Sequence, residues 1–277
     1  HFFLKILSTI FGIIIISGIS AAILFWYTYG PRIKEYQQEA KKTVWDGSST
    51  DFKMCQTSYV YADDGTQLAK LKSDKDVDYV SFDDLPEDVL NAFVSIEDKR
   101  FWEHHGVDWL STAKAAFLLL RNDGDIKRGG STITQQLARN VYLNFETSYE
   151  RKLREIFTAL ELEKKYTKKE ILEFYVNNIN YSNGYYGIGA AARGYFGVSV
   201  SKLNYSEIAF LCAIPNNPTY YNPRTEIKHT IKRRNIILAE MYRQEFLKKN
   251  EYLQAVNSSV QLEEPKEEFY NYESSYA

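Results

Sequence analysis

The sequence predicts a mainly α-helical fold with an N-terminal transmembrane helix and a short β-hairpin before the helical domain. Three observations lead to this prediction: an uncharged apolar segment opens the chain, apolar residues recur with helical spacing from Leu85 onward, and glycines and prolines interrupt that spacing. Pro86 suits a helix start, because its fixed φ matches the first turn. Further helices are expected at 107–121, 132–143, 150–165, 168–178, 186–195, 204–213 and 228–245.

Residues 1–31 are expected to form a membrane anchor. No charged residue lies between Lys5 and Arg32, and this span of about 26 residues exceeds the roughly 20 that a helix needs to cross a bilayer. Trp26 and Tyr27 lie near its far end, where aromatic side chains gather at a membrane surface. A cleaved signal peptide is the alternative, but its apolar region is shorter. Basic residues flank both ends, so charge does not decide the orientation.

Three segments follow the predicted anchor. Residues 32–57 are expected to form a stalk, helical in composition at first and irregular from about residue 43. Residues 58–250 are expected to form the main domain, which begins with two short strands around Asp64-Gly65, a dipeptide typical of hairpin turns. Residues 251–277 have weak periodicity and are expected to be a linker toward a further C-terminal domain.

The composition narrows the classes of partner only slightly. A net charge of −2 gives no indication of nucleic-acid binding. The 22 tyrosines and 16 phenylalanines suit either apolar or carbohydrate-like partners or an aromatic-rich core. Cys55 and Cys212 form no disulfide framework and have no metal-ligand spacing, and Cys212 lies in an apolar run where we expect a buried free thiol.

Glu97 is the first candidate catalytic acid. Leu90, Phe93, Val94 and Glu97 follow at i, i+3, i+4 and i+7, so the carboxyl group lies on the helix face that turns toward the core. Burial disfavours the charged form of a carboxyl group and so raises its pKa. A carboxyl group with a raised pKa can exchange protons near neutrality. The alternative is an ordinary glutamate at a helix end that pairs with a neighbouring basic residue.

Glu155 is the second candidate acid. It lies off the apolar stripe of its helix, and Arg151 and Lys152 precede it by four and three residues, which places cations on the same helix face. Two acids in different environments are typical of an acid and base pair. The alternative is a solvated helix with ordinary ion pairs.

The stretch RGGSTITQQLARN at residues 128–140 is the third candidate site. Thr132 and Gln135 fit a capping box, and the glycines before them permit close approach of the backbone. Free N–H groups at a helix start attract anions, and Lys127, Arg128 and Arg139 add positive charge. We therefore expect a ligand that carries phosphate and hydroxyl groups, with a plain capped surface helix as the alternative.

The stretch VDWLSTAKAAFLLL at residues 107–120 is more apolar than one core face requires. It is expected either to dip into the bilayer surface near the anchor or to form a buried core helix.

Five ordered motifs extend this reading: EDKRFWEHHGVD, GGSTITQQLARN, RKLRE, KKEILEFYVNNI and GIGAAARGYFG. Together they resemble the motif series of family 51 glycosyltransferases, the peptidoglycan glycosyltransferases of class A penicillin-binding proteins and monofunctional wall polymerases. The resemblance covers about residues 58–245. It implies a lysozyme-like fold with a larger lobe and a smaller, membrane-facing jaw. It also implies polymerisation of lipid II outside the bacterial cytoplasmic membrane, with inversion at the sugar and release of undecaprenyl diphosphate.

The resemblance also implies roles for individual residues. Glu97 would be the general base for the acceptor 4-hydroxyl, and Glu155 would assist departure of the diphosphate and organise cations around it. Substrate contacts are implied for Asp98, Phe101, His105, Gly130, Ser131, Thr132, Gln135, Gln136, Arg139, Arg151, Lys152 and Arg154. No cofactor and no metal site are expected to be required, although a divalent cation (Mg²⁺ or Mn²⁺) could screen the diphosphate.

Some positions depart from the family pattern. Arg139 and Arg154 stand where the family often has lysine, so a planar fork replaces a point charge. The segment NNINYSNGYYG departs from the usual Tyr-Phe-Gly-x-Gly form, which leaves Asn180 to Gly184 without an assigned role. The tail EEFYNYESSYA resembles the entry to a transpeptidase domain.

The expected partners are lipid II, lipid-linked glycan, the membrane and other wall-synthesis proteins, and nucleic acid is not expected. Two other functions remain open from the sequence: a glycan-cleaving muramidase on the same fold, and an inactive anchor that recruits wall-synthesis proteins.

Overall fold

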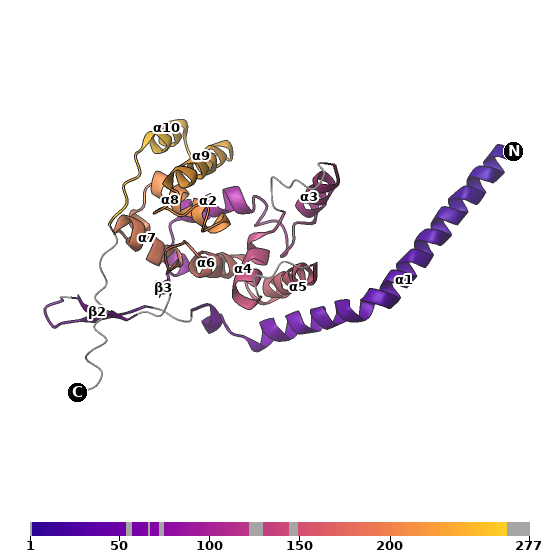
Figure 1. Cartoon of the computed structure of the whole chain (residues 1–277), viewed down its shortest axis with the longest axis horizontal. Coiled ribbons are helices and arrows are strands. Elements are labelled where there is room, and N and C mark those ends of the chain that lie inside the picture. Colours follow the sequence, from indigo (N-terminus) through magenta and orange to yellow (C-terminus); the bar gives the residue numbers. More distant parts are fainter. Residues whose placement is uncertain are drawn as a thin grey trace.

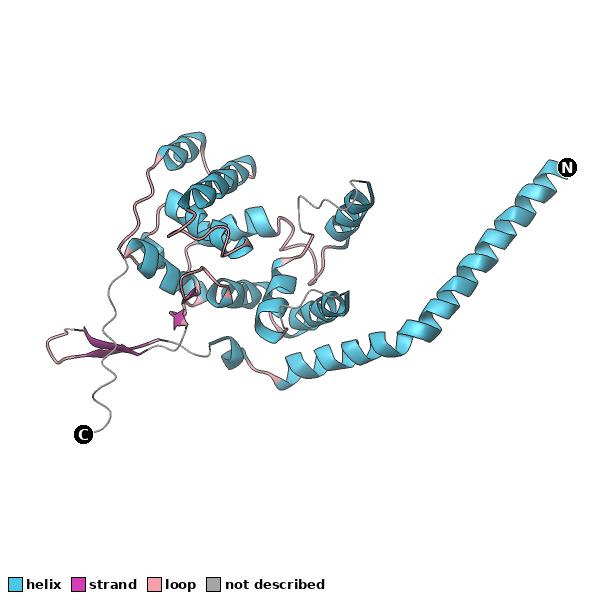
Figure 2. Ribbon diagram, viewed as in Figure 1, coloured by secondary structure: helices cyan, strands magenta, loops and turns pink. Residues whose placement is uncertain are grey.

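The computed structural model describes residues 2–53, 57–65, 67–71, 75–121, 130–143 and 149–264. These residues are mainly helical, as the sequence predicts (Figure 2). The α-helices are α1 (Phe2–Asp46), α2 (Glu87–Glu97), α3 (Trp109–Arg121), α4 (Ile133–Tyr142), α5 (Tyr149–Lys165), α6 (Lys168–Asn178), α7 (Ile188–Phe196), α8 (Tyr205–Ala213), α9 (Ile227–Arg243) and α10 (Lys249–Asn257). Short 3₁₀ helices lie at Ser49–Lys53, Phe82–Asp84, Val200–Lys202 and Ile214–Asn216.

Helix α1 is long and apolar enough to cross a membrane. Its apolar side chains, such as Phe11 and Ile16, lie exposed, which suits lipid rather than a protein core. The helix continues through Pro31 instead of ending there. Figure 1 shows that α1 is bent along its length and extends far beyond the helical body. We attribute a bend in such a helix to its internal proline, which removes one backbone hydrogen bond.

The segment expected to be a stalk is part of the packed domain. Tyr36, Ala40 and Val44, four residues apart, form one buried stripe of α1. Trp45 Nε1 donates to Glu161 of α5 over 3.0 Å, and Lys165 Nζ donates to the Val44 carbonyl over 2.7 Å. The apolar stripe has only one residue per turn, so it is inconspicuous in a polar sequence and becomes significant only once α5 covers it.

The predicted hairpin is present, and a second strand pair accompanies it. Strands β1 (Ser58–Tyr61) and β2 (Gln67–Leu71) pair antiparallel, and Gly65 has a φ of 83° in the turn between them. Strands β3 (Asp76–Val77) and β4 (Tyr185–Tyr186) pair in parallel. Tyr186, expected at the start of a helix, therefore belongs to β4, and α7 begins at Ile188.

The helical body has one continuous apolar core. Residues from α2, α4, α6, α7, α8 and α9 contribute to it, and α4 contacts both α5 and α6. Cys212 lies within it as the expected buried free thiol, and burial raises the pKa of this thiol well above its usual value. Cys55 lies outside the described residues.

Three large apolar side chains of helix α3 lie exposed. Trp109, Leu110 and Phe117 are 61 %, 53 % and 63 % exposed. The alternative of a core helix is therefore wrong for these three side chains.

The packed domain extends past residue 250, where we expected a linker. Helix α10 contacts α8 and α9, and its Ala255 is buried. Arg234 of α9 is buried and donates to the carbonyls of Val256 and Ser258, each over 3.0 Å. One internal guanidinium thus fixes the end of α10, a role that no local periodicity predicts.

Replacing Phe52 by Ala is expected to destabilise the chain by about 3–5 kcal/mol. The Phe52 ring is 2 % exposed and stacks on Phe174 at 4.1 Å between centroids, so its removal leaves a cavity where the segment after α1 meets α6. Thermal or urea unfolding in detergent measures the loss. Tyr149→Ala is the control, because Tyr149 is 95 % exposed, and equal effects of the two changes would contradict the prediction.

Candidate active site

The start of α4 carries the capping box that the sequence predicts. Gln135 N donates to Thr132 Oγ1 over 3.1 Å, and Thr132 N donates to Gln135 Oε1 over 2.9 Å. Thr132 Oγ1 also donates to the Gly106 carbonyl over 2.6 Å, and both side chains are buried. Both side chains therefore bond to the helix start, and their contacts with a substrate stay a prediction.

Asp98 provides a second cap for α4 from outside the helix. Its Oδ2 accepts from Ile133 N over 2.9 Å, and the same carboxylate pairs with His104 Nε2 over 2.9 Å. Both side chains are buried, whereas His105 is exposed. Asp98 therefore contacts backbone and imidazole instead of solvent, and His104 is the histidine that supports the site.

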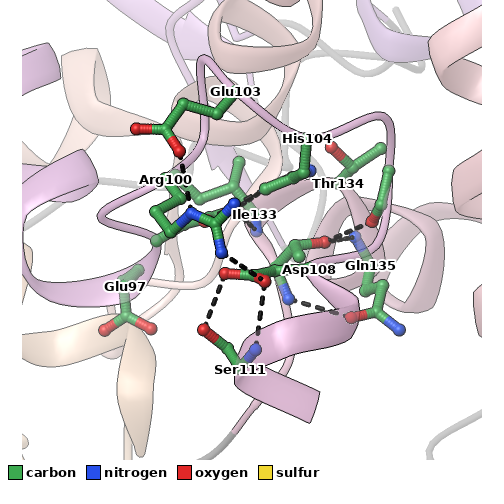
Figure 3. Close-up of polar contacts among 12 residues, drawn as sticks. Glu97, Arg100, Glu103, His104, Asp108, Ser111, Ile133, Thr134 and Gln135 are labelled. Carbon is green, nitrogen blue, oxygen red and sulfur yellow. Dashed lines mark hydrogen bonds and ion pairs between the residues drawn. The ribbon is translucent and has the colours of Figure 1, made fainter. Parts of the chain in front are cut away.

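The loop between α2 and α3 is held by Asp108. This carboxylate accepts from Arg100 Nη1 over 3.2 Å and from Ser111 Oγ over 2.6 Å (Figure 3). Burial alone raises the pKa of Asp108, but the hydrogen bonds from Ser111 and the charge of Arg100 outweigh burial, so this pKa lies below its usual value. Glu97 lies beside this group in Figure 3, at the end of α2.

Glu97 is held by one donor on each carboxylate oxygen. Arg233 Nη2 of α9 pairs with Oε1 over 3.0 Å, and Gln136 Nε2 of α4 donates to Oε2 over 3.0 Å. The Glu97 side chain is 11 % exposed, so it remains accessible to solvent. Neither Lys99 nor Arg100 is the partner of this carboxylate, because Lys99 pairs with Glu240 and Arg100 with Glu103 and Asp108.

Tyr175 of α6 fixes the orientation of the Gln136 amide. Its hydroxyl donates to Gln136 Oε1 over 3.1 Å, which leaves the Gln136 NH₂ group to face Glu97. Burial raises the pKa of Tyr175 well above its usual value and the charge of Glu97 raises it further, so the phenol keeps its proton. The positive charge of Arg139 lowers the pKa of Tyr175, but burial outweighs it.

Glu155 is surrounded by the cations that the sequence places before it. Lys152 Nζ bonds to Glu155 Oε1, and Arg151 Nη1 lies 3.5 Å from Oε2. Lys152 Nζ also donates to Ser131 Oγ over 2.7 Å. The Glu155 side chain is 0 % exposed, whereas those of Lys152 and Arg151 are 38 % and 20 % exposed. The cations therefore face outward, and the acid lies behind them.

The first turns of α4 connect the two acids. Ser131, immediately before the helix, bonds to the Lys152–Glu155 pair, and Gln136 bonds to Glu97. The two carboxylates come from α2 and α5, 58 positions apart in the chain (155 − 97), yet they share this one support. The arrangement combines an accessible acid with an accessible pair of cations, as proton removal beside a departing anion requires.

The remaining predicted substrate contacts lie in different places. Phe101 is fully buried under Lys168, with Nζ 4.4 Å from the ring centroid.

Arg154 lies against α1 instead of beside the other cations. It pairs with Glu39, and its guanidinium lies 4.5 Å from the Tyr36 ring centroid. Gly130 lies beside Thr112. Lys127, Arg128 and Gly129 lie outside the described residues. The catalytic and binding roles of these residues stay predictions.

Sequence reasoning missed Arg233, Tyr175 and His104. Arg233 lies one helical turn before Ile237, so a cation beside a buried stripe was the available signal. Tyr175 lies on the buried face of its helix and was indistinguishable from an ordinary core residue. His104 could not be distinguished from His105, because only the path of the loop decides which ring turns inward.

No group of three or more His, Cys, Asp or Glu side chains in the described ranges could hold a metal ion.

The fold and the site define a helical domain in which two acids, each held by basic side chains, lie near one helix start, and which carries an N-terminal helix apolar enough to cross a membrane. The sequence model of the family described as "Transglycosylase" matches residues 64–242. The chain therefore belongs to the transglycosylase family, and the resemblance inferred from the five motifs is confirmed.

Individual relatives agree with this family. The chain is 41 % identical over 219 residues to Penicillin-binding protein 4 of Bacillus subtilis (strain 168), covering 79 % of this chain and 35 % of that protein. It is 42 % identical over 195 residues to Penicillin-binding protein 1A of Aquifex aeolicus (strain VF5), covering 70 % and 27 %. The chain thus spans about a third or less of the length of these relatives. The crystal structure of Penicillin-Binding Protein 1A from Haemophilus influenzae matches with a TM-score of 0.44 at 22 % identity, covering 76 % of this chain and 22 % of that one.

Replacing Thr132 by Val is expected to destabilise the chain by about 1–2 kcal/mol, because the change removes the cap of α4. Thermal unfolding measures this loss. Thr167→Val removes the equivalent hydroxyl from the capping box of α6 and serves as the matched control. Since Thr132 is buried and also bonds to Gly106, its change should cost more than the control. A Thr132 variant of full stability but raised KM would contradict a purely structural role.

Proposed function

We propose that this chain is a peptidoglycan glycosyltransferase that polymerises lipid II into β-1,4-linked glycan strands by an inverting mechanism. Lipid II is a disaccharide-pentapeptide on undecaprenyl diphosphate, and the diphosphate lipid is the leaving group. Membership of the transglycosylase family supports glycosyl transfer. The observation that carries the proposal is the shared support of Glu97 and the Glu155 cations by α4, because the reaction needs a base and an anion site at one sugar.

Glu97 acts as the general base in this proposal. Its carboxylate accepts the proton of the acceptor 4-hydroxyl while the oxygen forms a bond to the anomeric carbon of the donor. Arg233 and Gln136 hold one carboxylate oxygen each, which fixes the direction in which the remaining lone pairs point. A base held in this way needs no reorganisation before it takes the proton.

Lys152 and Arg151 stabilise the departing diphosphate. The bond from the anomeric carbon to the diphosphate oxygen breaks with its electron pair on that oxygen, so negative charge grows there. Both cations are partly exposed, and Ser131 adds a hydroxyl beside Lys152. Glu155 is buried behind them, so it acts by holding the two cations in place. A positioning role for Glu155 is narrower than the leaving-group assistance that the family resemblance implies.

Inversion requires that the attacking oxygen and the leaving group lie on opposite faces of the donor sugar. Inverting glycosidases separate their carboxyl groups by about 6.5–9.5 Å, and we expect Glu97 and Glu155 to be at least that far apart. Glu97 bonds to Gln136 within α4, whereas Lys152 beside Glu155 bonds to Ser131 before the helix, and these different contacts support the separation.

The substrate and the enzyme meet at a membrane surface in this proposal. α1 supplies a single-pass anchor in the bacterial cytoplasmic membrane, and the catalytic domain lies outside it. The exposed Trp109, Leu110 and Phe117 of α3 support contact of this helix with lipid.

A divalent cation is not assigned to a side chain. Glu97 and Glu155 are each engaged by basic side chains, and the described residues offer no ligand cluster. The proposed steps are assigned to residues of the chain, and a divalent cation (Mg²⁺ or Mn²⁺) at the diphosphate stays an expectation.

Replacing Glu97 by Gln is expected to lower kcat for lipid II polymerisation by about 10²–10⁴-fold, the contribution of a general base. Gel analysis of labelled glycan strands measures the rate. Glu103→Gln is the control, because Glu103 is exposed and pairs only with Arg100 among the described residues. Undiminished polymer from the Glu97 variant would favour an inactive anchor. Release of reducing ends from finished glycan by the wild type, with no polymer from lipid II, would favour a muramidase.

Lys152→Met is expected to lower kcat by about 10²-fold, because it removes a positive charge from the leaving group. Lys164→Met is the matched control on the same helix, since Lys164 is 62 % exposed and pairs with Glu161, and such a surface pair contributes only about 0–1 kcal/mol to stability. Lys152→Arg should restore part of the rate by restoring the charge. Equal losses in the two methionine variants, at equal thermal stability, would contradict this assignment.

A further inference from the structure

A second polar cavity lies outside the site around Glu97 and Glu155. Its volume is about 340 Å³, and three separate parts of the chain line it: Lys75 beside β3, residues 180–186 before and within β4, and residues 218–222 before α9. β3 lies on the far side of α6 from α5 (Figure 1). The cavity is therefore separate from the cations that surround Glu155.

The wall of this cavity is the segment that departs from the family pattern. Within NNINYSNGYYG, Ser182 and Asn183 have φ values of 68° and 50°, in the left-handed region that side chains disfavour. Hydrogen bonds hold this conformation: Asn180 Oδ1 accepts from Ser182 N over 2.7 Å, and Asn183 Nδ2 donates to Tyr195 over 2.7 Å. Strained backbone that is held in this way is typical of binding and active sites.

The lining has the chemistry of a carbohydrate site. Asn180, Asn183 and Asn222 contribute amides, which both donate and accept, and Ser182 and Thr219 contribute hydroxyls. Among the described residues that line the cavity, none carries a carboxylate. Asn180 Nδ2 makes no hydrogen bond to any described residue, so its amide can donate to a ligand. Asn183 Nδ2 donates to Asn222 Oδ1 over 2.9 Å as well as to Tyr195, so these two amides are engaged within the wall. Sugar hydroxyls and acetamido groups pair with the amide donors and acceptors that remain.

A chain of contacts links the cavity wall to Glu97. Asn222 in the cavity wall follows Tyr221, whose ring centroid lies 5.3 Å from the Arg233 guanidinium. Arg233 in turn bonds to Glu97. A saccharide chain that leaves the neighbourhood of Glu97 on this side would pass the cavity.

We infer that this cavity is a non-catalytic subsite for an N-acetylated saccharide, which binds a part of the glycan away from the reacting bond. The identity of that saccharide as peptidoglycan rests on the proposed function. The binding itself rests only on the asparagine amides and the hydroxyls of the lining.

The test uses the full 277-residue chain in detergent micelles, titrated with the tetrasaccharide of N-acetylglucosamine and followed by ligand-observed NMR. Asn180→Asp keeps the oxygen that accepts from Ser182 N and removes only the amide donor. It should weaken binding about tenfold, the effect of one hydrogen-bonding group. Thr219→Trp places a ring in the cavity from an exposed turn and should weaken binding further.

Two controls make the result specific. Asn250→Asp adds the same negative charge at an exposed position of α10 and should leave the affinity unchanged. A tetrasaccharide of glucose lacks acetamido groups and should bind more weakly than its N-acetylated counterpart. Equal affinity of the wild type and both cavity variants would overturn the inference, and so would equal affinity for the two sugars.

Glu97→Gln separates this inference from the proposed function. The variant should lose polymerisation and keep the binding of the tetrasaccharide. A wild type that binds the sugar but makes no polymer would contradict the proposed function and leave the subsite intact. A wild type that makes polymer without measurable cavity binding would refute the subsite alone.

Discussion

The first turn of α4 is the constraint on which the site depends. Its free N–H groups are satisfied by its own Thr132 and by Asp98, which directly follows Glu97 in the chain. The bond from Ile133 N to Asp98 therefore fixes the end of α2 relative to the start of α4. An unsatisfied buried N–H group costs about 1–3 kcal/mol, so this attachment is strongly favoured. Because Glu97 precedes Asp98, capping one helix also positions the predicted base.

Buried charge organises the other half of the site. Moving a carboxylate out of water costs free energy unless cations and hydrogen bonds compensate for the lost solvation. Lys152 and Arg151 provide this compensation for Glu155. The stabilisation is mutual, because Glu155 also holds the Lys152 and Arg151 side chains in place. Because Glu155 is buried and the two cations are partly exposed, the surface at this point is positively charged. A positive surface suits an anionic leaving group.

Helix α1, the predicted anchor, packs against α5, the helix that carries Glu155. α1 continues past Pro31 and packs along α5 through Tyr36, Ala40 and Val44. Since α5 carries Glu155, the height and tilt of the predicted anchor in a membrane would set the position of the cations relative to the lipid surface. For a substrate that is itself held in a membrane, this is a direct way to bring donor and site to the same level.

Sequence alone determined helices α2 to α9, the apolar N-terminal segment, the hairpin, the capping box and the cations three and four residues before Glu155, because each depends on residues within a few positions of one another. It also identified the family through five ordered motifs. Only the tertiary structure decided that Arg233 and Tyr175 support Glu97, that Arg154 turns to Glu39, and that Arg234 holds α10 in the domain. These contacts join residues far apart in the chain, and their geometry exists only once the helices have packed, so no local periodicity can encode it.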